Sequence, residues 1–237
     1  MSLPWWRELR VGIAPGRLIL RGSVHAVNDP AVELKSVGTR ARLAVVLSNH
    51  FARYAVLPWS AALGSEDDWH AFARHNFAAV YGAGAAAWTI RVSSAGRGFA
   101  RVACAIDTAL LDSLRAVGSV ASIQPYLMAA FNRRARSLDS TSAWFVIQES
   151  GCLTACLVQE RQWRLVRNRR VNGSWHEALS HLLERERAAS DGTLRCDRVL
   201  LYAESMPPSA LGEYRLTDTT LPRGASPDSR ACAMVFD

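Results

Sequence analysis

Lysine is almost absent from this chain, although its formal net charge is +7 at pH 7. Of its 237 residues, 28 are lysine or arginine, and Lys35 is the only lysine. A basic protein that binds nucleic acid usually carries a recognisable binding module, and the sequence contains none. Such an arginine bias reflects coding composition more than selection for phosphate contacts. We therefore expect no nucleic-acid partner and interpret the arginine clusters as solvated faces, with an acidic partner or an anionic lipid surface as the alternative.

Long apolar runs and a secretory signal are also lacking. No stretch reaches the roughly 20 apolar residues of a membrane-spanning helix, and the segment MSLPWWRELR contains no apolar signal core. The five cysteines therefore indicate a reducing compartment. Cys152 and Cys156 lie four positions apart on a predicted strand, a separation of roughly 13 Å that excludes a disulfide or a shared metal. These features predict a cytoplasmic protein, in which any peripheral membrane association would need a partner or a surface patch.

Standard catalytic and metal-binding patterns are missing as well. The sequence has no G-x-S-x-G elbow, no Walker lysine motif and no zinc-type cysteine spacing. Two histidine pairs, His70 with His75 and His176 with His181, are each five positions apart on predicted helices. A zinc site on a helix needs a spacing of three or four, because only then do both rings face the same side. We predict no catalytic residue and no metal site.

What the sequence does have is a run of three predicted strands between residues 143 and 170. The segments 143–148, 152–158 and 162–169 are β-rich and separated by two short turns, which predicts a β-meander. It is the most ordered pattern in the chain.

The first turn of this meander has the residues of a phosphate-binding hairpin. Glu149-Ser150-Gly151 combines an acid with a glycine, and Thr154 follows three residues later. An acid and a hydroxyl beside a backbone turn suit a phosphate or a hard cation such as Mg²⁺. The alternative is an ordinary hairpin turn in which Gly151 supplies a positive φ, and we favour it because the first hairpin of the chain offers no partner acid.

The rest of the chain predicts alternating strands and helices. Before the meander, strands are expected at 9–13, 17–21, 43–47, 53–57, 88–92, 99–105 and 120–123, and helices after Ser65, after Asp107 and from Pro125. After it we expect a helix from the capping pattern at 174–177, a strand at 198–202 and a last short strand at 231–236. Residues 22–42 predict an irregular loop, and residues 207–227 a turn-rich stretch.

This order, with a hairpin at the start of each half, resembles the actin-like ATPase superfamily, and within it the cytoplasmic domains of the PilM, MshI and GspL type. The segments that carry the resemblance are VGIAPGRLILRG (11–22), LSNHFARYAVLPW (47–59), SIQPYLMAAFNRR (122–134) and FVIQESGCLTACLVQERQWRLVRNR (145–169). The resemblance implies an α/β fold that is actin-like, a duplicated ribonuclease H-like unit. It implies two lobes, 1–140 and 141–237, each with a mixed β-sheet flanked by helices.

The resemblance also implies a nucleotide site with three elements, of which two are lost. The remaining one, the second phosphate hairpin, keeps Gly151 and Thr154 but has Glu149 in place of the usual aspartate. Active members have an aspartate beside the first hairpin turn, where this chain has VGIAP (11–15) and no carboxylate. The adenosine-contact turn normally has paired glycines, whereas Glu204 stands in that stretch here. We therefore expect no cofactor. ATP with Mg²⁺ would bind only if Glu149, Ser150, Gly151 and Thr154 still form a working phosphate site.

Two functions follow from the resemblance. The first is a non-catalytic scaffold or assembly protein of a type IV pilus or type II secretion inner-membrane platform. It would bind a short segment of a membrane component, in a groove between the lobes or at an exposed strand edge. The alternative is a nucleotide-dependent actin-like ATPase that uses Glu149 and Thr154, with Asp107 as a remote acid.

Two groups of residues are candidates for contact with the protein partner. Trp5 and Trp6 are adjacent aromatics beside an arginine, which suits a partner or membrane interface, and the alternative is docking on the chain's own core. Arg164, Arg167 and Arg169 lie on the third strand of the meander, where they would receive an acidic peptide, and the alternative is a solvated sheet face.

Overall fold

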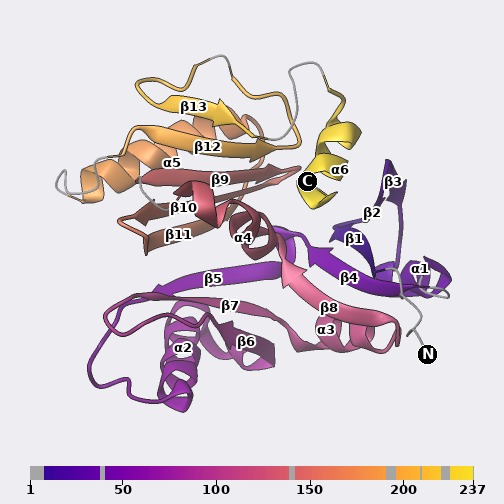
Figure 1. The fold of residues 1–237 in the computed structure, drawn as a ribbon, viewed down its shortest axis with the longest axis horizontal. Coiled ribbons are helices and arrows are strands. Elements are labelled where there is room, and N and C mark those ends of the chain that lie inside the picture. The colour runs from indigo at the N-terminus through magenta and orange to yellow at the C-terminus, as the bar shows by residue number, and fades with distance from the viewer. Residues whose placement is uncertain are drawn as a thin grey trace, which may run out of the picture.

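Three β-sheets organise the computed structural model, which describes residues 8–37, 41–138, 142–190, 196–208, 210–219 and 225–236. Two of the sheets have five strands of mixed direction, and the third has three antiparallel strands. In Figure 1 the sheet of the C-terminal lobe lies at the upper left, with the three-stranded sheet below it and the large N-terminal sheet to the right. The α/β fold with a mixed sheet and helices in each lobe is therefore confirmed. The predicted boundary between residues 140 and 141 lies outside the described residues and stays a prediction.

The large N-terminal sheet has the strand order β3-β2-β1-β4-β8. Its strands are β1 (Glu8–Ala14), β2 (Arg17–Leu20), β3 (Ser23–Ala26), β4 (Arg42–Leu47) and β8 (Val120–Pro125). β1 and β2 form the expected hairpin, in which Ala14 pairs with Arg17 and Gly16 has a φ of +66°. Pro15 fixes the backbone before that glycine, so the two residues together set the turn.

The loop expected over residues 22–42 is wrong, because this segment contains β3 and the helix α1 (Pro30–Val37). The side chain of Asp29 caps α1 by accepting a hydrogen bond from the backbone N–H of Ala31 at 2.8 Å. Leu34 is the one residue of the helix that is fully buried. Ala31 and Val37 are half-buried against the same core, so the apolar stripe of this eight-residue helix has only three members and is too short to be recognised.

The three-stranded sheet has the order β5-β7-β6 and is covered by α2 (Glu66–Tyr81). Its strands are β5 (Ala52–Leu57), β6 (Trp88–Val92) and β7 (Arg101–Asp107), and the 3₁₀ helix η2 (Gly82–Ala87) precedes β6. Ser65 caps α2 in a complete capping box with Asp68. Trp69, Ala73 and Phe77 are buried as predicted, whereas Val80, in the last turn of the helix, is 67% exposed.

The C-terminal sheet confirms the predicted meander and extends it to the order β11-β10-β9-β12-β13. Its strands are β9 (Ala143–Glu149), β10 (Cys152–Gln159), β11 (Gln162–Arg170), β12 (Arg198–Ala203) and β13 (Arg215–Asp218). The helix α5 (Trp175–Ala189) covers one face and is capped by Ser174, as predicted. β13 lies within residues 207–227, which were expected to be turn-rich, and it pairs with β12 in parallel.

The last strand expected at 231–236 is wrong, because these residues belong to the helix α6 (Pro227–Phe236). Ala231, Met234 and Val235 are buried. The helix lies between the two lobes, against β1, β2 and β3 on one side and β12 on the other (Figure 1). A short helix that is buried on several sides reads as a continuous apolar run, which periodicity cannot distinguish from a strand.

The two lobes share one continuous hydrophobic core. It joins Val11, Leu43 and Tyr54 of the N-terminal lobe to Phe145 and Tyr202 of the C-terminal lobe. The helices α3 (Thr108–Arg115) and α4 (Tyr126–Leu138) follow β7 and β8, and both contribute side chains to this core. The lobes therefore pack as one body around the segments that follow β4 and β9.

Candidate functional site

The β9–β10 turn lies at the junction between the two lobes. Glu149 pairs with Cys152 across the hairpin, which leaves Ser150 and Gly151 as the turn residues. Gly151 has a φ of +74°, a backbone conformation that residues with a side chain rarely adopt. A Cβ atom built on Gly151 would lie 3.5 Å from the His50 ring, which is ordinary contact. The glycine is therefore needed for its backbone conformation, as the sequence indicated.

Glu149 is buried and bonded across the lobes. Its Oε2 accepts a hydrogen bond from the backbone N–H of Asn49 at 3.1 Å, and only 4% of the residue is exposed. Burial raises the pKa of the Glu149 carboxyl to about 7, nearby Glu204 raises it further, and hydrogen bonds from Ser48 and Asn49 oppose the shift. A carboxyl with this pKa is partly protonated near neutral pH and is a poor ligand for a hard cation.

The partner of Glu149 belongs to the short 3₁₀ helix η1 (Asn49–Phe51), which follows β4. The Ser48 side chain caps it by accepting a hydrogen bond from the backbone N–H of His50 at 3.2 Å. Asn49 is fully buried, and its Oδ1 accepts hydrogen bonds from the Tyr54 hydroxyl at 2.6 Å and from the backbone N–H of Leu127 at 3.1 Å. These contacts hold η1 firmly against the β9–β10 turn.

His50 adds a second contact between η1 and that turn. Its Nε2 donates a hydrogen bond to the carbonyl oxygen of Ser150 at 2.8 Å. Burial lowers the pKa of His50, and the hydrogen bond to this carbonyl opposes the shift. The ring is therefore mostly neutral at pH 7 and serves as a fixed donor.

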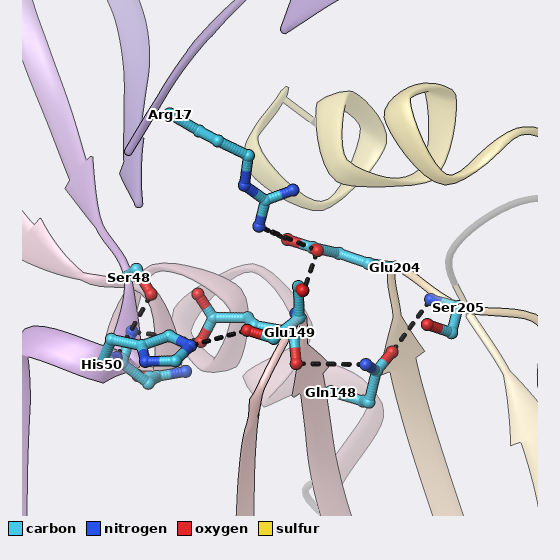
Figure 2. Close-up of polar contacts among 9 residues, drawn as sticks. Arg17, Ser48, His50, Gln148, Glu149, Glu204 and Ser205 are labelled. Carbon is cyan, nitrogen blue, oxygen red and sulfur yellow. Dashed lines mark hydrogen bonds and ion pairs between the residues drawn. The ribbon is translucent and has the colours of Figure 1, made fainter. Parts of the chain in front are cut away.

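Glu204 joins the first hairpin of the chain to the β9–β10 turn. Both oxygens of its carboxylate accept from Nη2 of Arg17, at 3.1 and 3.0 Å, and Oε2 also accepts from the backbone N–H of Ser150 at 3.0 Å. Figure 2 shows the Arg17 guanidinium and the turn converging on this carboxylate. Gln148 supports the arrangement, because its Oε1 accepts from the backbone N–H of Ser205 at 2.9 Å.

The predicted phosphate-site residues are only partly brought together. Glu149, Ser150 and Gly151 lie at the junction, but Thr154 lies inside β10, opposite Ile147 and Asn168. Thr154 is fully buried, and the side-chain contact that the structure shows for it is a weak one to Cys152 Sγ at 4.0 Å. Asp107 caps α3 by accepting from the backbone N–H of Leu110 at 3.1 Å. Its carboxylate is therefore engaged in helix capping.

The predicted partner-binding residues differ from one another in their surroundings. Trp5 and Trp6 lie outside the described residues. Arg167 forms a bidentate ion pair with Glu186 of α5, in which Nε donates to Oε1 at 2.9 Å and Nη2 donates to Oε2 at 2.8 Å. Arg164 lies 3.6 Å from Glu160, and Arg169 is exposed. Part of the arginine row is thus paired within the chain.

The residues that sequence reasoning missed at the junction are Arg17, Ser48, Asn49 and His50. They stand far from the β9–β10 turn in the sequence, and neither turn signals nor periodicity relates the two segments. Ser48-Asn49-His50 was read only as a link between two strands. One signal was available: a Ser-Asn pair directly after a buried strand favours a capped turn with donors at its start.

The described residues contain no group of three or more His, Cys, Asp or Glu side chains that could hold a metal ion. Within the same residues, no helix is both long and apolar enough to cross a membrane.

Comparison with known proteins relates the chain to others through structure alone. No protein-family model matches the sequence, and no curated protein matches it. One similar solved structure is the cytoplasmic domain of EpsL, an inner-membrane component of the type II secretion system of Vibrio cholerae. It is 15% identical in sequence with a TM-score of 0.57, and the match covers 95% of this chain and 93% of that one. A chain of the PilM–PilN type IV pilus biogenesis complex is 14% identical with a TM-score of 0.57, over 84% and 82% of the two chains.

A third solved structure is an actin-like ATPase fold protein of unknown function from Bacteroides thetaiotaomicron. It is 9% identical with a TM-score of 0.58, over 85% of this chain and 82% of that one. Each of the three likenesses extends over more than four fifths of both chains compared. This chain therefore has the actin-like ATPase fold, which it shares with the EpsL cytoplasmic domain.

Proposed function

We propose that this protein is a non-catalytic scaffold of a type IV pilus or type II secretion inner-membrane platform and that it acts by binding a short segment of a partner protein. The fold is shared with structures named for both kinds of machine. In this role the protein is cytoplasmic, at the inner face of the inner membrane, and it associates with the membrane through its partner. The observation that carries the proposal is a groove bordered by two strand edges.

This groove, the β6–β8 groove, has a volume of about 470 Å³ and lies between β6, β7, α3 and β8. Among the described residues, β8 pairs only with β4, and β6 pairs only with β7, so each strand has one edge without a neighbouring strand. Residues of both edge strands line the groove. An unpaired strand edge offers backbone N–H and C=O groups to an extended peptide. The groove therefore suits a segment that adds to β6 or β8.

The lining of the groove specifies the chemistry of that segment. Most side chains that line it are apolar, including Val92, Val102, Ile106, Leu111, Ile123 and Met128. Two arginines, Arg91 and Arg115, also line it, and Arg115 forms an exposed ion pair with Asp112 at 3.4 Å. An extended apolar segment with one acidic residue would fill the pockets and pair with an arginine.

The junction supports the non-catalytic part of the proposal. The first hairpin turn, Pro15-Gly16, offers no carboxylate, and Glu149 is buried with a raised pKa. The donors that would face a phosphate, Arg17 and the backbone N–H of Ser150, both bind Glu204. These residues do not fit ATP with Mg²⁺, so we infer no step through a nucleotide. Saturable binding of ATP with Mg²⁺ at micromolar affinity, measured by calorimetry, would contradict this part.

The binding part is tested with peptides and one groove-filling variant. The peptides are the cytoplasmic segments of single-span membrane proteins encoded beside this gene, titrated by calorimetry. We expect one of them to bind, and Val92→Trp to weaken that binding by roughly tenfold or more, because the indole would occupy the groove. Val80→Trp is the matched control, since Val80 is 67% exposed on α2 and does not line the groove. Equal weakening by both variants, or by neither, would contradict the assignment of the groove.

A further inference from the structure

Two loops meet at one end of the three-stranded sheet. One loop, residues 58–65, follows β5, and the other, residues 93–100, joins β6 to β7. They lie at the same end because β5 and β6 both run antiparallel to β7, so that Leu57, the last residue of β5, is opposite Arg101, the first residue of β7. A pocket of about 390 Å³ is lined by residues of both loops. It shares no lining residue with the β6–β8 groove.

The floor of this pocket is an arginine held between a ring and a carboxylate. Trp69 of α2 is 3% exposed, and the Arg101 guanidinium lies 4.5 Å from the centre of its ring. Nη1 of Arg101 also donates to both carboxylate oxygens of Glu66, at 2.7 and 2.8 Å. Only 12% of the Arg101 side chain is exposed. Stacking and ion pairing together fix the guanidinium, so the floor is formed before any partner binds.

The rim of the pocket presents an indole and a guanidinium to solvent. Trp59 is 39% exposed, whereas tryptophan is on average a well-buried residue. Arg97 is exposed and stands between two glycines. Within the described part of the chain, no hydrogen bond or ion pair involves Arg97. Tryptophan and arginine are the residue types most enriched among those that dominate protein–protein binding, and the rim therefore has the composition of an interface hot spot.

The charges of the pocket determine the chemistry of its partner. Of the described residues that line it, Glu66, Arg97 and Arg101 are charged. Glu66 is bound by Arg101, which leaves the positive charge of Arg97 uncompensated. The two loops contain no other charged residue. A single carboxylate on a partner would therefore pair with Arg97, while an aromatic or proline ring beside it would pack on the Trp59 indole.

An anionic membrane surface fits the pocket less well, because acidic residues lie directly beside it. The first turn of α2 contains Glu66, Asp67 and Asp68, and Asp67 is exposed. Anionic headgroups spread over a surface would meet these carboxylates as well as the arginine. A peptide segment can place one carboxylate at Arg97 and keep the rest of its charge away. The observations therefore favour a protein partner.

We propose that this pocket, the Trp59–Arg97 pocket, binds a segment of a protein partner in which an aromatic or proline ring lies beside a carboxylate. The ring packs on Trp59, and the carboxylate pairs with Arg97. The pocket is a second docking site that goes beyond the proposed scaffold function, because it is separate from the β6–β8 groove. With two such sites the protein would hold two partners at once.

The test selects ligands from a library of random peptides displayed on phage. The library is first depleted on the double variant Trp59→Ala, Arg97→Glu, which retains the β6–β8 groove and removes peptides that bind elsewhere on the chain. The remaining phage are then captured on the natural full chain. We expect the enriched peptides to combine Trp, Tyr, Phe or Pro with a neighbouring Asp or Glu. A synthetic peptide with the most enriched sequence is titrated by calorimetry.

Trp59→Ala and Arg97→Ala should each weaken the binding of this peptide by roughly tenfold or more. Replacing the acid of the peptide by its amide should remove the effect of Arg97→Ala, since both changes break the same ion pair. Phe99→Ala and Arg74→Ala are the matched controls. Phe99 is 42% exposed in the same loop as Arg97 but does not line the pocket, and Arg74 is an exposed arginine of α2. Val92→Trp, which fills the other groove, should leave this binding unchanged.

Three results would overturn the proposal: no enrichment on the natural chain after depletion, enriched peptides that lack a ring or a carboxylate, or equal weakening by Arg97→Ala and Arg74→Ala. Binding of phosphatidylglycerol vesicles that Arg97→Ala abolishes, with no peptide enriched, would assign the pocket to a membrane surface and also contradict it. If Trp59→Ala does not fold, Arg97→Glu alone serves for the depletion, and Arg97→Ala alone decides the titration. Failure of peptide binding in the β6–β8 groove changes none of these outcomes.

Discussion

Glu149 accepts a hydrogen bond from the backbone N–H of Asn49 at 3.1 Å, although the two residues are 100 positions apart in the sequence. Glu149 ends β9 in the C-terminal lobe, and Asn49 begins η1 in the N-terminal lobe. The bond therefore holds the lobes together through a carboxyl group that is almost completely buried. The pKa of that carboxyl is raised, and the stability of the protein should consequently depend on pH.

We expect Glu149 to make the protein less stable as the pH rises. Its pKa is 4.5 in the unfolded chain and about 7 in the folded one, so the folded state binds more protons between these values. Between pH 4.5 and about 7 the free energy of unfolding should fall by roughly 3 kcal/mol from this group alone, and above that range it should level off. Urea unfolding at several pH values should show this decline in the natural chain relative to Glu149→Gln. If the free energies of unfolding of the natural chain and of Glu149→Gln differ by the same amount at every pH, the raised pKa is contradicted.

Tyr54→Phe should destabilise the fold by about 1 kcal/mol, because the Tyr54 hydroxyl donates to Asn49 Oδ1 and both groups are buried. Loss of this bond loosens η1 without creating a cavity. Tyr81→Phe is the matched control, since Tyr81 is 42% exposed at the end of α2. Chemical denaturation of both variants measures the difference, and equal stabilities would show that the hydroxyl bond to Asn49 contributes nothing.

Gly151→Ala should cost about 1 kcal/mol of stability, since alanine is strained at a φ of +74°. The new methyl group meets the His50 ring only at ordinary contact distance, so the cost comes from the backbone. Gly84→Ala serves as the control, because Gly84 has no positive φ and no atom near its Cβ position. The thermal midpoint should drop for the first variant only, and a drop of the same size in both would refute this explanation.

Arg167→Ala should destabilise the protein by about 1 kcal/mol, a modest value because 43% of the Arg167 side chain is exposed. Its loss leaves the buried Glu186 with only Arg185 as a charged partner among the ion pairs shown. Arg169→Ala should change stability by less than about 0.5 kcal/mol, as for most exposed positions. Unfolding of both variants is measured in low and in high salt. A larger loss of stability in Arg169→Ala than in Arg167→Ala would contradict a stabilising Arg167–Glu186 ion pair.

Local sequence patterns predicted the strands that are joined by contiguous turns and the helices that begin with a capping motif. The meander was correct because its turns and its β-rich runs are contiguous, and α2 was correct because Ser65 and Asp68 form a capping box. α1 and α6 were not recognised, because α1 has only eight residues with a short apolar stripe, and α6 is apolar on several sides between the lobes. Their structure depends on packing partners that are distant in sequence.

Only the local part of the candidate site could be predicted from the sequence. The turn with Glu149 and Gly151 was identified from its own residues. The role of Arg17 and of η1 was not, because these residues reach the turn only through the packing of one lobe against the other. Sequence placed an acid at Glu204 but gave no indication that it binds Arg17.

Hydrogen exchange of the backbone amides, with and without the partner peptide, tests the central proposal most directly. The probe is whichever cytoplasmic peptide, from a single-span protein encoded beside this gene, binds in the calorimetric screen. We expect slower exchange in β6 and β8, because an added strand would hydrogen-bond to one of these edges and cover the other. Protection of the β9–β10 turn instead, with β6 and β8 unchanged, would contradict binding in the β6–β8 groove.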